Sequence, residues 1–220
     1  MIHQGAFCQA LWQIVFIRKE LNLKVICLTG GIASGKTTAS RFLEEKGAAI
    51  IDADKLGHRV YDTGTQGYLA VIQVFGEDIV DENSQIDRKI LGGKVFGNPG
   101  RLKQLTDIVW PEIRRLAELE ISGYEAQEPD GVVVLEAAVL FEAGWQDMGD
   151  EIWVVVVNPE AAIARAMARD GLDREAVEKR LAAQISNEER TAQATVVIEN
   201  NGTLEEMRGA LEVEWVKSTS

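Results

Sequence analysis

The feature that most constrains this chain is the glycine-rich segment at residues 30–37, Gly-Gly-Ile-Ala-Ser-Gly-Lys-Thr, directly after an apolar run. It matches the pattern Gly-x-x-x-x-Gly-Lys-Thr in full. In such a loop the glycines let backbone N–H groups turn inward around phosphate oxygens, and the following helix points its positive end at the same anion. We expect Lys36 to bridge the β- and γ-phosphates and the Thr37 hydroxyl to ligate Mg²⁺. The expected nucleotide-binding residues are Gly30, Gly31, Ile32, Ala33, Ser34, Gly35, Lys36, Thr37 and Thr38.

Five short apolar runs rich in β-branched residues predict the strands of the fold. They are Lys24–Thr29, Ala48–Ala53, Val132–Leu135, Ile152–Val157 and Ala194–Ile198. The runs are continuous rather than alternating, which is typical of strands covered on both faces, and longer amphipathic stretches separate them. This alternation predicts an α/β fold with a P-loop NTPase core, a five-stranded parallel sheet and helices on both faces.

Two long connections interrupt this pattern and predict a division of the chain. The segment at about 57–130 is far longer than one crossover helix needs, and we expect a helical insert there, with helices at Gly67–Val74, Asp87–Phe96 and Pro99–Ile121. Such an insert is a natural place for an acceptor pocket, although it could also be structural padding. Two short helices at about 159–185, the first capped by Asn158 with proline at its first position and the second capped by Asp173, would form a lid. The core with both additions would span 24–217, after an N-terminal extension at 1–23.

The extension and the overall charge limit the partners. Residues 6–17 are mostly apolar but too few to span a bilayer, and no basic residue precedes them as in a secretory signal. We expect either a short helix packed on the core or a disordered extension. A net charge of -12 argues against nucleic-acid binding, which needs a basic face. Two cysteines without a CxxC pattern favour a reducing compartment and hence the cytoplasm, with organellar targeting by residues 1–23 left open. The sequence does not give the oligomeric state.

Carboxylates follow two of the predicted strands. Asp52-Ala53-Asp54 ends the second one, and residues two apart on a strand face the same side, at the edge of the sheet where ligands bind. One of these carboxylates could accept a proton from an acceptor hydroxyl and the other could orient water around Mg²⁺; alternatively, either could cap the next helix. Glu136 follows the third strand and could hold a water of the metal shell, or could be a solvated turn residue.

Two further groups are candidates for nucleotide contacts. Arg165 and Arg169 lie four residues apart and share a helix face, so an arginine there could stabilise charge on the transferring phosphoryl group. An exposed charged stripe is the alternative. Asn200, after the fifth strand, could read the adenine edge, or could belong to an ordinary Asn-Gly turn.

Taken in order, these motifs resemble the dephospho-CoA kinase family. The resemblance covers about 24–217 and rests on the loop, on Asp52-Ala53-Asp54, Phe75-Gly76 and Asp87-Arg88, and on Asn200-Asn201-Gly202. Residues 107–113 and 137–145 are similar to the kinase half of the animal bifunctional CoA synthase.

The resemblance implies transfer of the ATP γ-phosphoryl group to the ribose 3′-hydroxyl of dephospho-CoA, giving coenzyme A. It implies that Asp54 is the base and also touches the acceptor together with Arg88. It further implies that Arg165 is the lid arginine, that Asn200 contacts adenine, and that the insert holds the pantetheine arm.

Two departures from the family pattern bear on these expectations. Trp110 stands where many members have histidine, so an acceptor contact by that histidine is lost or replaced. Ala33 stands where glycine is usual and is expected to fit if its φ is negative.

Other activities stay open as alternatives. Another small-molecule P-loop kinase, acting on a nucleoside, nucleotide or sugar acid, is the leading one. A GTPase-like switch is disfavoured because no Asn-Lys-x-Asp element is present, and an ATP-binding scaffold without turnover is disfavoured by the intact Lys36, Thr37 and Asp54.

Overall fold

A computed structural model describes residues 23–220, so both expectations for the N-terminal extension lie outside the described residues. The strands are β1 Lys24–Gly30, β2 Ala49–Asp52, β3 Val132–Glu136, β4 Glu151–Val156 and β5 Val196–Glu199. The helices are α2 Lys36–Glu45, α3 Ala53–Arg59, α4 Gln66–Phe75, α5 Arg88–Val95, α6 Pro99–Glu125, α7 Pro159–Asp170, α8 Arg174–Ala182, α9 Asn187–Thr191 and α10 Leu204–Ser218, with short 3-10 turns η1 Glu77–Ile79 and η2 Gln146–Met148.

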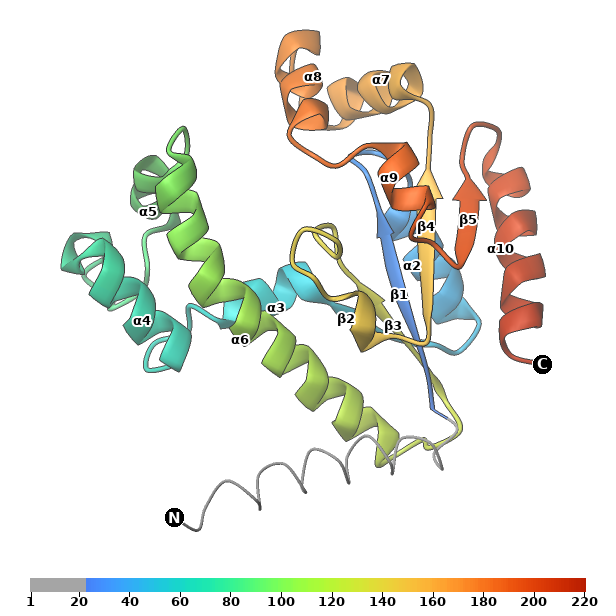
Figure 1. The fold of residues 1–220 in the computed structure, drawn as a ribbon, viewed down its shortest axis with the longest axis horizontal. Helices are drawn as coiled ribbons and strands as arrows, with labels where there is room; N and C mark the ends of the chain where they lie inside the picture. Colours follow the sequence, from blue (N-terminus) through green and yellow to red (C-terminus); the bar gives the residue numbers. More distant parts are fainter. Residues whose placement is uncertain (1–22) are drawn as a thin grey trace.

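The five strands form one parallel sheet in the order β2-β3-β1-β4-β5, as the apolar runs predict (Figure 1). The central strand β1 pairs with β3 on one side and β4 on the other, and Val25 to Gly30 are all buried. All carboxyl ends of the strands meet at one edge, and the order reverses beside β1. A ligand in a parallel sheet binds at this point, and the glycine-rich loop begins there.

Side chains alternate along the strands and supply two separate cores. From β1, Val25 and Cys27 join the core covered by α3 to α6, whereas Ile26 and Leu28 join the core covered by α2 and α10. This division follows from the period of two along a strand. Figure 1 shows α10 on the side of the sheet away from α6. Both faces of the sheet are therefore covered, as continuous apolar strands require.

The connection between β2 and β3 is mostly helical, with an isolated antiparallel bridge between Val80 and Ile86, and the three predicted helices occur as α4, α5 and α6. The long helix α6 is continuous through Pro111 and buries Val109, Ile113, Ala117 and Ile121 against the first core. Figure 1 shows α4 and α5 beside the upper half of α6, away from the sheet.

The second strand ends earlier than expected. β2 stops at Asp52, which is the N-cap of α3: its Oδ1 accepts from the N–H of Asp54 at 3.0 Å and of Lys55 at 3.2 Å. Asp52 and Asp54 therefore do not alternate along one strand, and the expectation based on strand geometry is wrong. The physical reason is that a short carboxylate satisfies the open N–H groups of a helix start, which favours turning into a helix at once.

The connection between β4 and β5 contains three short helices, one more than predicted. α7 begins as expected, with Asn158 accepting from the N–H of Ala161 and proline at the first turn, and it ends at Gly171 with a φ of 67°. A small apolar cluster of Ile163, Ala166 and Val177 holds α7 to α8 and also packs against Ile32 and Ala33 of the glycine-rich loop. The unpredicted helix is α9, which begins at Ser186 with a capping box to Glu189.

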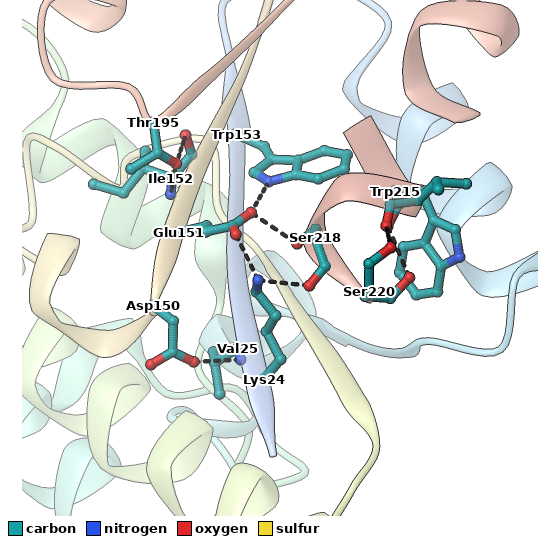
Figure 2. A network of polar contacts seen from close by, with 12 residues as sticks. Lys24, Val25, Asp150, Glu151, Ile152, Trp153, Thr195, Trp215, Ser218 and Ser220 are labelled. Carbon is teal, nitrogen blue, oxygen red and sulfur yellow. Dashed lines mark hydrogen bonds and ion pairs between the residues drawn. The ribbon is translucent and has the colours of Figure 1, made fainter. Parts of the chain in front are cut away.

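The opposite edge of the sheet is closed by a polar network (Figure 2). The Glu151 carboxylate accepts from Lys24 Nζ at 2.6 Å, Trp153 Nε1 at 2.7 Å and Ser218 Oγ at 2.9 Å. Lys24 Nζ also donates to the Ser218 carbonyl at 2.7 Å, so the last turn of α10 is fastened to β1 and β4. Partial burial tends to raise the pKa of Glu151, but the three hydrogen bonds outweigh it and lower this pKa.

No helix within residues 23–220 has the length and apolar character needed to cross a membrane.

Candidate active site

The glycine-rich loop borders a cavity of about 810 Å³ at the carboxyl edge of the sheet. All of the residues expected to bind nucleotide from Gly30 to Thr38 line it, together with Asp54, Ala138, Arg165, Arg169, Arg180, Ala183 and Gln184. The loop turns directly into α2, whose first residue is Lys36. The positive end of a helix and the inward N–H groups therefore face the cavity, an arrangement suited to phosphate.

Gly35 is required at its position for two reasons. Its φ is 103°, in the left-handed region, and a Cβ placed there would lie 2.3 Å from Nδ2 of Asn200. Asn200 is buried and its Nδ2 donates to the Ser34 carbonyl at 2.7 Å. The amide that was expected to read adenine thus contacts the loop backbone. An additional contact with adenine stays a prediction.

Ala33 does not have the expected negative φ: its value is 54°. Left-handed backbone costs an alanine about 1–2 kcal/mol. The apolar contact of Ala33 with the α7–α8 cluster offsets part of this cost. The loop therefore keeps the shape that glycine usually permits, with some strain stored in it.

Lys36 forms an ion pair with Glu136 across the sheet. Lys36 Nζ lies 2.6 Å from Glu136 Oε1, and the two side chains are only 14% and 10% exposed. Glu136 is the last residue of β3, beside β1 in the sheet, so it is a buried ion-pair partner and not a solvated turn residue. The same ammonium group is expected to bind phosphate, so the Glu136 carboxylate and phosphate would compete for it.

A second cavity, of about 490 Å³, adjoins the first at Thr37 and is also lined by Asp52 and Glu136. One hydroxyl and two carboxylates are hard oxygen donors of the kind that Mg²⁺ prefers. Within residues 23–220 no group of three or more His, Cys, Asp or Glu side chains is arranged to hold a metal by itself. Mg²⁺ is usually held by few protein ligands together with waters and substrate phosphates, so the Thr37 hydroxyl and the carboxylates of Asp52 and Glu136 are donors of the type that suits it.

Asp54 lies in the first turn of α3 and its side chain opens into the larger cavity. Loss of hydration raises the pKa of its carboxyl group; Lys36 opposes the shift, and the nearby carboxylates of Asp52 and Glu136 add to it. Asp54 is thus a carboxylate of increased basicity beside the phosphate-binding loop. These are properties of a general base.

The two arginines of α7 both line the cavity but differ in their partners. Arg165 is partly buried, and its Nη2 donates to the Asn200 carbonyl at 3.0 Å. Arg169 is 61% exposed and pairs with Asp170, with Nε 2.7 Å from Oδ1. Arg165 is therefore held at the cavity by the end of β5, whereas Arg169 is a surface ion pair at its rim.

Arg88 lies outside these cavities. It is the first residue of α5, its Nη1 is 3.0 Å from Nε2 of His58, and its guanidinium stacks over the Tyr61 ring at 5.4 Å. His58 is on the same helix as Asp54, one turn later, so Arg88 and Asp54 are linked through α3. Trp110 is partly buried against the core on α6.

Two further polar residues at the loop were not predicted. Gln184 Oε1 accepts from the N–H of Ile32 at 3.0 Å, and Arg190 of α9 lies behind Gly31. Neither belongs to a motif. Arg190 belongs to the polar stretch Asn187–Arg190, whose composition is typical of an exposed helix, but in the structure the arginine is only 3% exposed.

The chain is similar to dephospho-CoA kinases in sequence. The family model described as dephospho-CoA kinase matches residues 24–206. The dephospho-CoA kinase of Geobacter sulfurreducens is 46% identical over 195 residues, which cover 89% of this chain and 98% of that protein. The dephospho-CoA kinase of Carboxydothermus hydrogenoformans is 44% identical over 193 residues, covering 86% and 91%.

Two solved structures are also similar to this chain. A Thermus thermophilus crystal structure has a TM-score of 0.75 and 35% identity, covering 90% of this chain and 100% of that one. The dephospho-CoA kinase from Campylobacter jejuni has a TM-score of 0.60 and 26% identity, covering 90% and 98%. The similarity extends over the sheet, the β2–β3 connection and the β4–β5 connection together.

Proposed function

The chain belongs to the dephospho-CoA kinase family, ATP-dependent kinases of the last step of CoA biosynthesis, and we propose how its residues transfer a phosphoryl group to the ribose 3′-hydroxyl of dephospho-CoA. One observation carries the proposal. The Asp54 carboxylate opens into the same cavity as the phosphate-binding loop, with its basicity raised by its surroundings. An acceptor hydroxyl placed between the loop and Asp54 would meet both a γ-phosphate and a base.

Asp54 accepts the proton. The 3′-oxygen forms a bond to the γ-phosphorus, the bond from that phosphorus to the β–γ bridging oxygen breaks, and ADP leaves. In a loose transition state the hydroxyl proton leaves late, so a positioned carboxylate acts by orienting the hydroxyl and by accepting the proton at the end.

Lys36 and the loop bind the triphosphate. Lys36 exchanges the Glu136 carboxylate for β- and γ-phosphate oxygens, and the N–H groups between Gly30 and Thr38 cradle the chain of phosphates. Mg²⁺ would be held by the Thr37 hydroxyl, with Asp52 and Glu136 binding waters of its shell, and would neutralise charge on the phosphates. Because Oδ1 of Asp52 already caps α3, the contribution of Asp52 falls to Oδ2, which also lies 3.4 Å from Nζ of the exposed Lys55.

Arg165 stabilises the transferring group. It points into the cavity from α7, and its bond to the Asn200 carbonyl aims the guanidinium. Charge shifts onto the bridging oxygen and the equatorial oxygens during transfer, and a fixed cation next to them lowers the barrier. Asn200 supports the loop through Ser34 and, at the end of β5, is in a position to meet adenine as well.

The division of the chain follows from these roles. The core and its additions span 24–217; the segment at about 57–130 holds the acceptor, with Arg88 and Asp54 as contacts; and the segment at about 159–185 acts as a lid over ATP. Support comes from the exposed apolar side chains on the acceptor segment, among them Leu69, Ile90 and Phe96, which could meet a pantetheine arm. A cytoplasmic location belongs to the same proposal, because two cysteines without a CxxC pattern favour a reducing compartment; organellar targeting by residues 1–23 is the alternative.

The test is product formation with a panel of acceptors. Wild-type protein with Mg-ATP is offered dephospho-CoA, a nucleoside, a nucleoside monophosphate and a sugar acid, with the Lys36→Met variant as the matched control. We expect phosphorylation of dephospho-CoA, with the new phosphate on the 3′-oxygen by NMR, and loss of transfer in the variant. Preferential phosphorylation of another acceptor, or a product labelled elsewhere, would overturn the assignment of the acceptor.

A further inference from the structure

A third cavity, of about 230 Å³, lies behind the phosphate-binding loop. Gly31, Ile32 and Ser34 line it from the loop, and residues of α7, of α9 and of the link before α9 line it from the other side. The guanidinium of Arg190 borders this space. It does not line the larger cavity of the proposed active site. The two cavities share Gly31, Ile32, Ser34 and Gln184, so Arg190 and Arg165 border adjoining spaces around the same loop.

Arg190 is a buried charge without an ion-pair partner among residues 23–220. It is 3% exposed, its Nε and Nη2 have no hydrogen-bond partner, and it forms no ion pair within residues 23–220. Burial lowers the pKa of the guanidinium, and Glu142 and Glu189 oppose this from a distance. A buried arginine without a paired anion is costly, and a bound anion close by would offset that cost.

The unsatisfied groups of the protein gather at the loop. Within residues 23–220, the buried side-chain atoms that lack a hydrogen-bond partner are Thr29 Oγ1, Ser34 Oγ and the two nitrogens of Arg190. Thr29 directly precedes the loop, Ser34 is in it, and Arg190 lies behind it. Waters in the cavity could satisfy the N–H and O–H groups, but they carry no negative charge to pair with the guanidinium.

Hydrogen bonds hold the start of α9, and therefore the backbone of Arg190, in place beside the loop. The capping box of Ser186 and Glu189 stabilises the start of α9, and Asn187 Nδ2 donates to the Val157 carbonyl at 3.0 Å. At the loop, a Cβ added to Gly31 would lie 3.1 Å from Arg190 Nη1 and 3.5 Å from Gln184 Oε1. Gly31 thus leaves room for two polar groups that approach from the α8–α9 side.

We propose that Arg190 is a positioning residue for the polyphosphate of a nucleotide. It supplies a fixed positive charge behind Gly31 that is offset when phosphates occupy the front of the loop. The inference rests on the proposed function, which places the nucleotide there. In the low dielectric of a buried site such a charge is weakly screened, so it acts on the phosphates through the loop without touching them.

The experiment compares Arg190→Met, Arg190→Lys and wild type. Arg208→Met, on the surface of α10, is the matched control. Affinities for adenosine, AMP, ADP and ATP are measured by calorimetry, and thermal unfolding is followed without nucleotide. We expect Arg190→Met to weaken ATP binding by about tenfold to thirtyfold, with a smaller loss for ADP and none for adenosine. Arg190→Lys should stay within about threefold of wild type, since it keeps the charge.

The stability readout separates this role from a structural one. Removing an uncompensated buried charge should leave the Tm of the unliganded protein unchanged or raise it. A lower Tm for Arg190→Met with unchanged nucleotide affinities would overturn the proposal, as would an equal loss for adenosine and ATP. A Lys36→Met arm keeps the two hypotheses distinct. If Lys36→Met binds ATP as wild type does, the proposed nucleotide site fails; if only Arg190→Met does, the inference about Arg190 fails.

Discussion

The exchange of Lys36 between Glu136 and phosphate can be tested with Glu136→Gln. The Lys36 ammonium lies 2.6 Å from the Glu136 carboxylate, and both side chains are largely buried. Glutamine keeps the shape and one oxygen acceptor but removes the negative charge. Two opposite effects are therefore expected, one on the stability of the unliganded protein and one on ATP binding.

Stability should fall moderately. Removing one partner of a fully buried ion pair costs about 3–5 kcal/mol. The pair here borders an open cavity of about 810 Å³, and the glutamine oxygen can still accept from Lys36, so we expect about 1–2 kcal/mol. For a domain of this size that corresponds to a Tm lower by about 3–6 °C.

Metal-free ATP should bind more tightly. Glu136 competes with phosphate for Lys36 and repels the phosphates; at a separation on the order of 8 Å and an effective dielectric of about 20, the repulsion is about 2 kcal/mol per charge pair. After allowance for solvent in the cavity, we expect affinity to increase about tenfold. With Mg²⁺ present the gain should shrink, because the variant loses a carboxylate that binds water of the metal shell.

Calorimetry with ATP in EDTA and with ATP in excess Mg²⁺ checks both effects, and thermal unfolding checks the stability. Glu44→Gln, which removes a negative charge elsewhere in the lining of the 490 Å³ cavity, is the control. Metal-free ATP that binds Glu136→Gln no better than wild type would refute the competition for Lys36.

Three further predictions address other parts of the protein. Arg165→Ala should lower kcat by about 10²-fold or more with a smaller change in the ATP KM, whereas Arg169→Ala should change kcat and KM by only a few-fold. Steady-state kinetics measure both variants, and an unchanged kcat in Arg165→Ala would show that Arg165 is only a surface charge. The raised pKa of Asp54 means that folding disfavours its charged form. Activity should therefore be lost as the pH falls through a pKa higher than that of a free aspartate, which a pH–rate profile checks. Asp54→Asn should unfold at the same or a higher temperature than wild type at pH 7, which thermal scans check. The pKa of Glu151 is lowered, so folding favours its charged form, and Glu151→Gln should reduce the free energy of unfolding by about 1–3 kcal/mol at neutral pH. This difference from wild type should fade as the pH falls through the folded-state pKa, and kcat should be unchanged. A loss of activity in the folded variant would show that this edge of the sheet is coupled to the active site.

The sheet and the loop could be predicted from the sequence because their signals are local. A continuous β-branched run can be buried on both faces, and the glycine pattern of Gly30 to Gly35 specifies a backbone that receives phosphate. The helix starts at Asn158 and Asp173 were also readable, since a cap and the first turn are adjacent in sequence.

The rest depends on contacts between distant residues or on backbone angles. The strand pattern continues to Ala53, and only the capping of α3 by Asp52 shows where β2 ends. The identity of Ala33 does not specify the sign of its φ, and the conformation of the whole loop sets this angle at 54°. The partners of Lys36 and Asn200 lie 100 and 166 residues away, and the burial of Arg190 contradicts its polar surroundings in the sequence.

The most direct test of the proposed mechanism is single-turnover transfer from ATP to dephospho-CoA by Asp54→Asn and Asp52→Asn, with ATP affinity measured in parallel. Asparagine preserves the shape of Asp54 and is as good a helix cap as Asp52, so both variants should fold. We expect Asp54→Asn to transfer about 10²–10⁴-fold more slowly while still binding ATP, and Asp52→Asn to lose much less. Transfer at the wild-type rate by Asp54→Asn, with Asp52→Asn inactive, would contradict the assignment of the base.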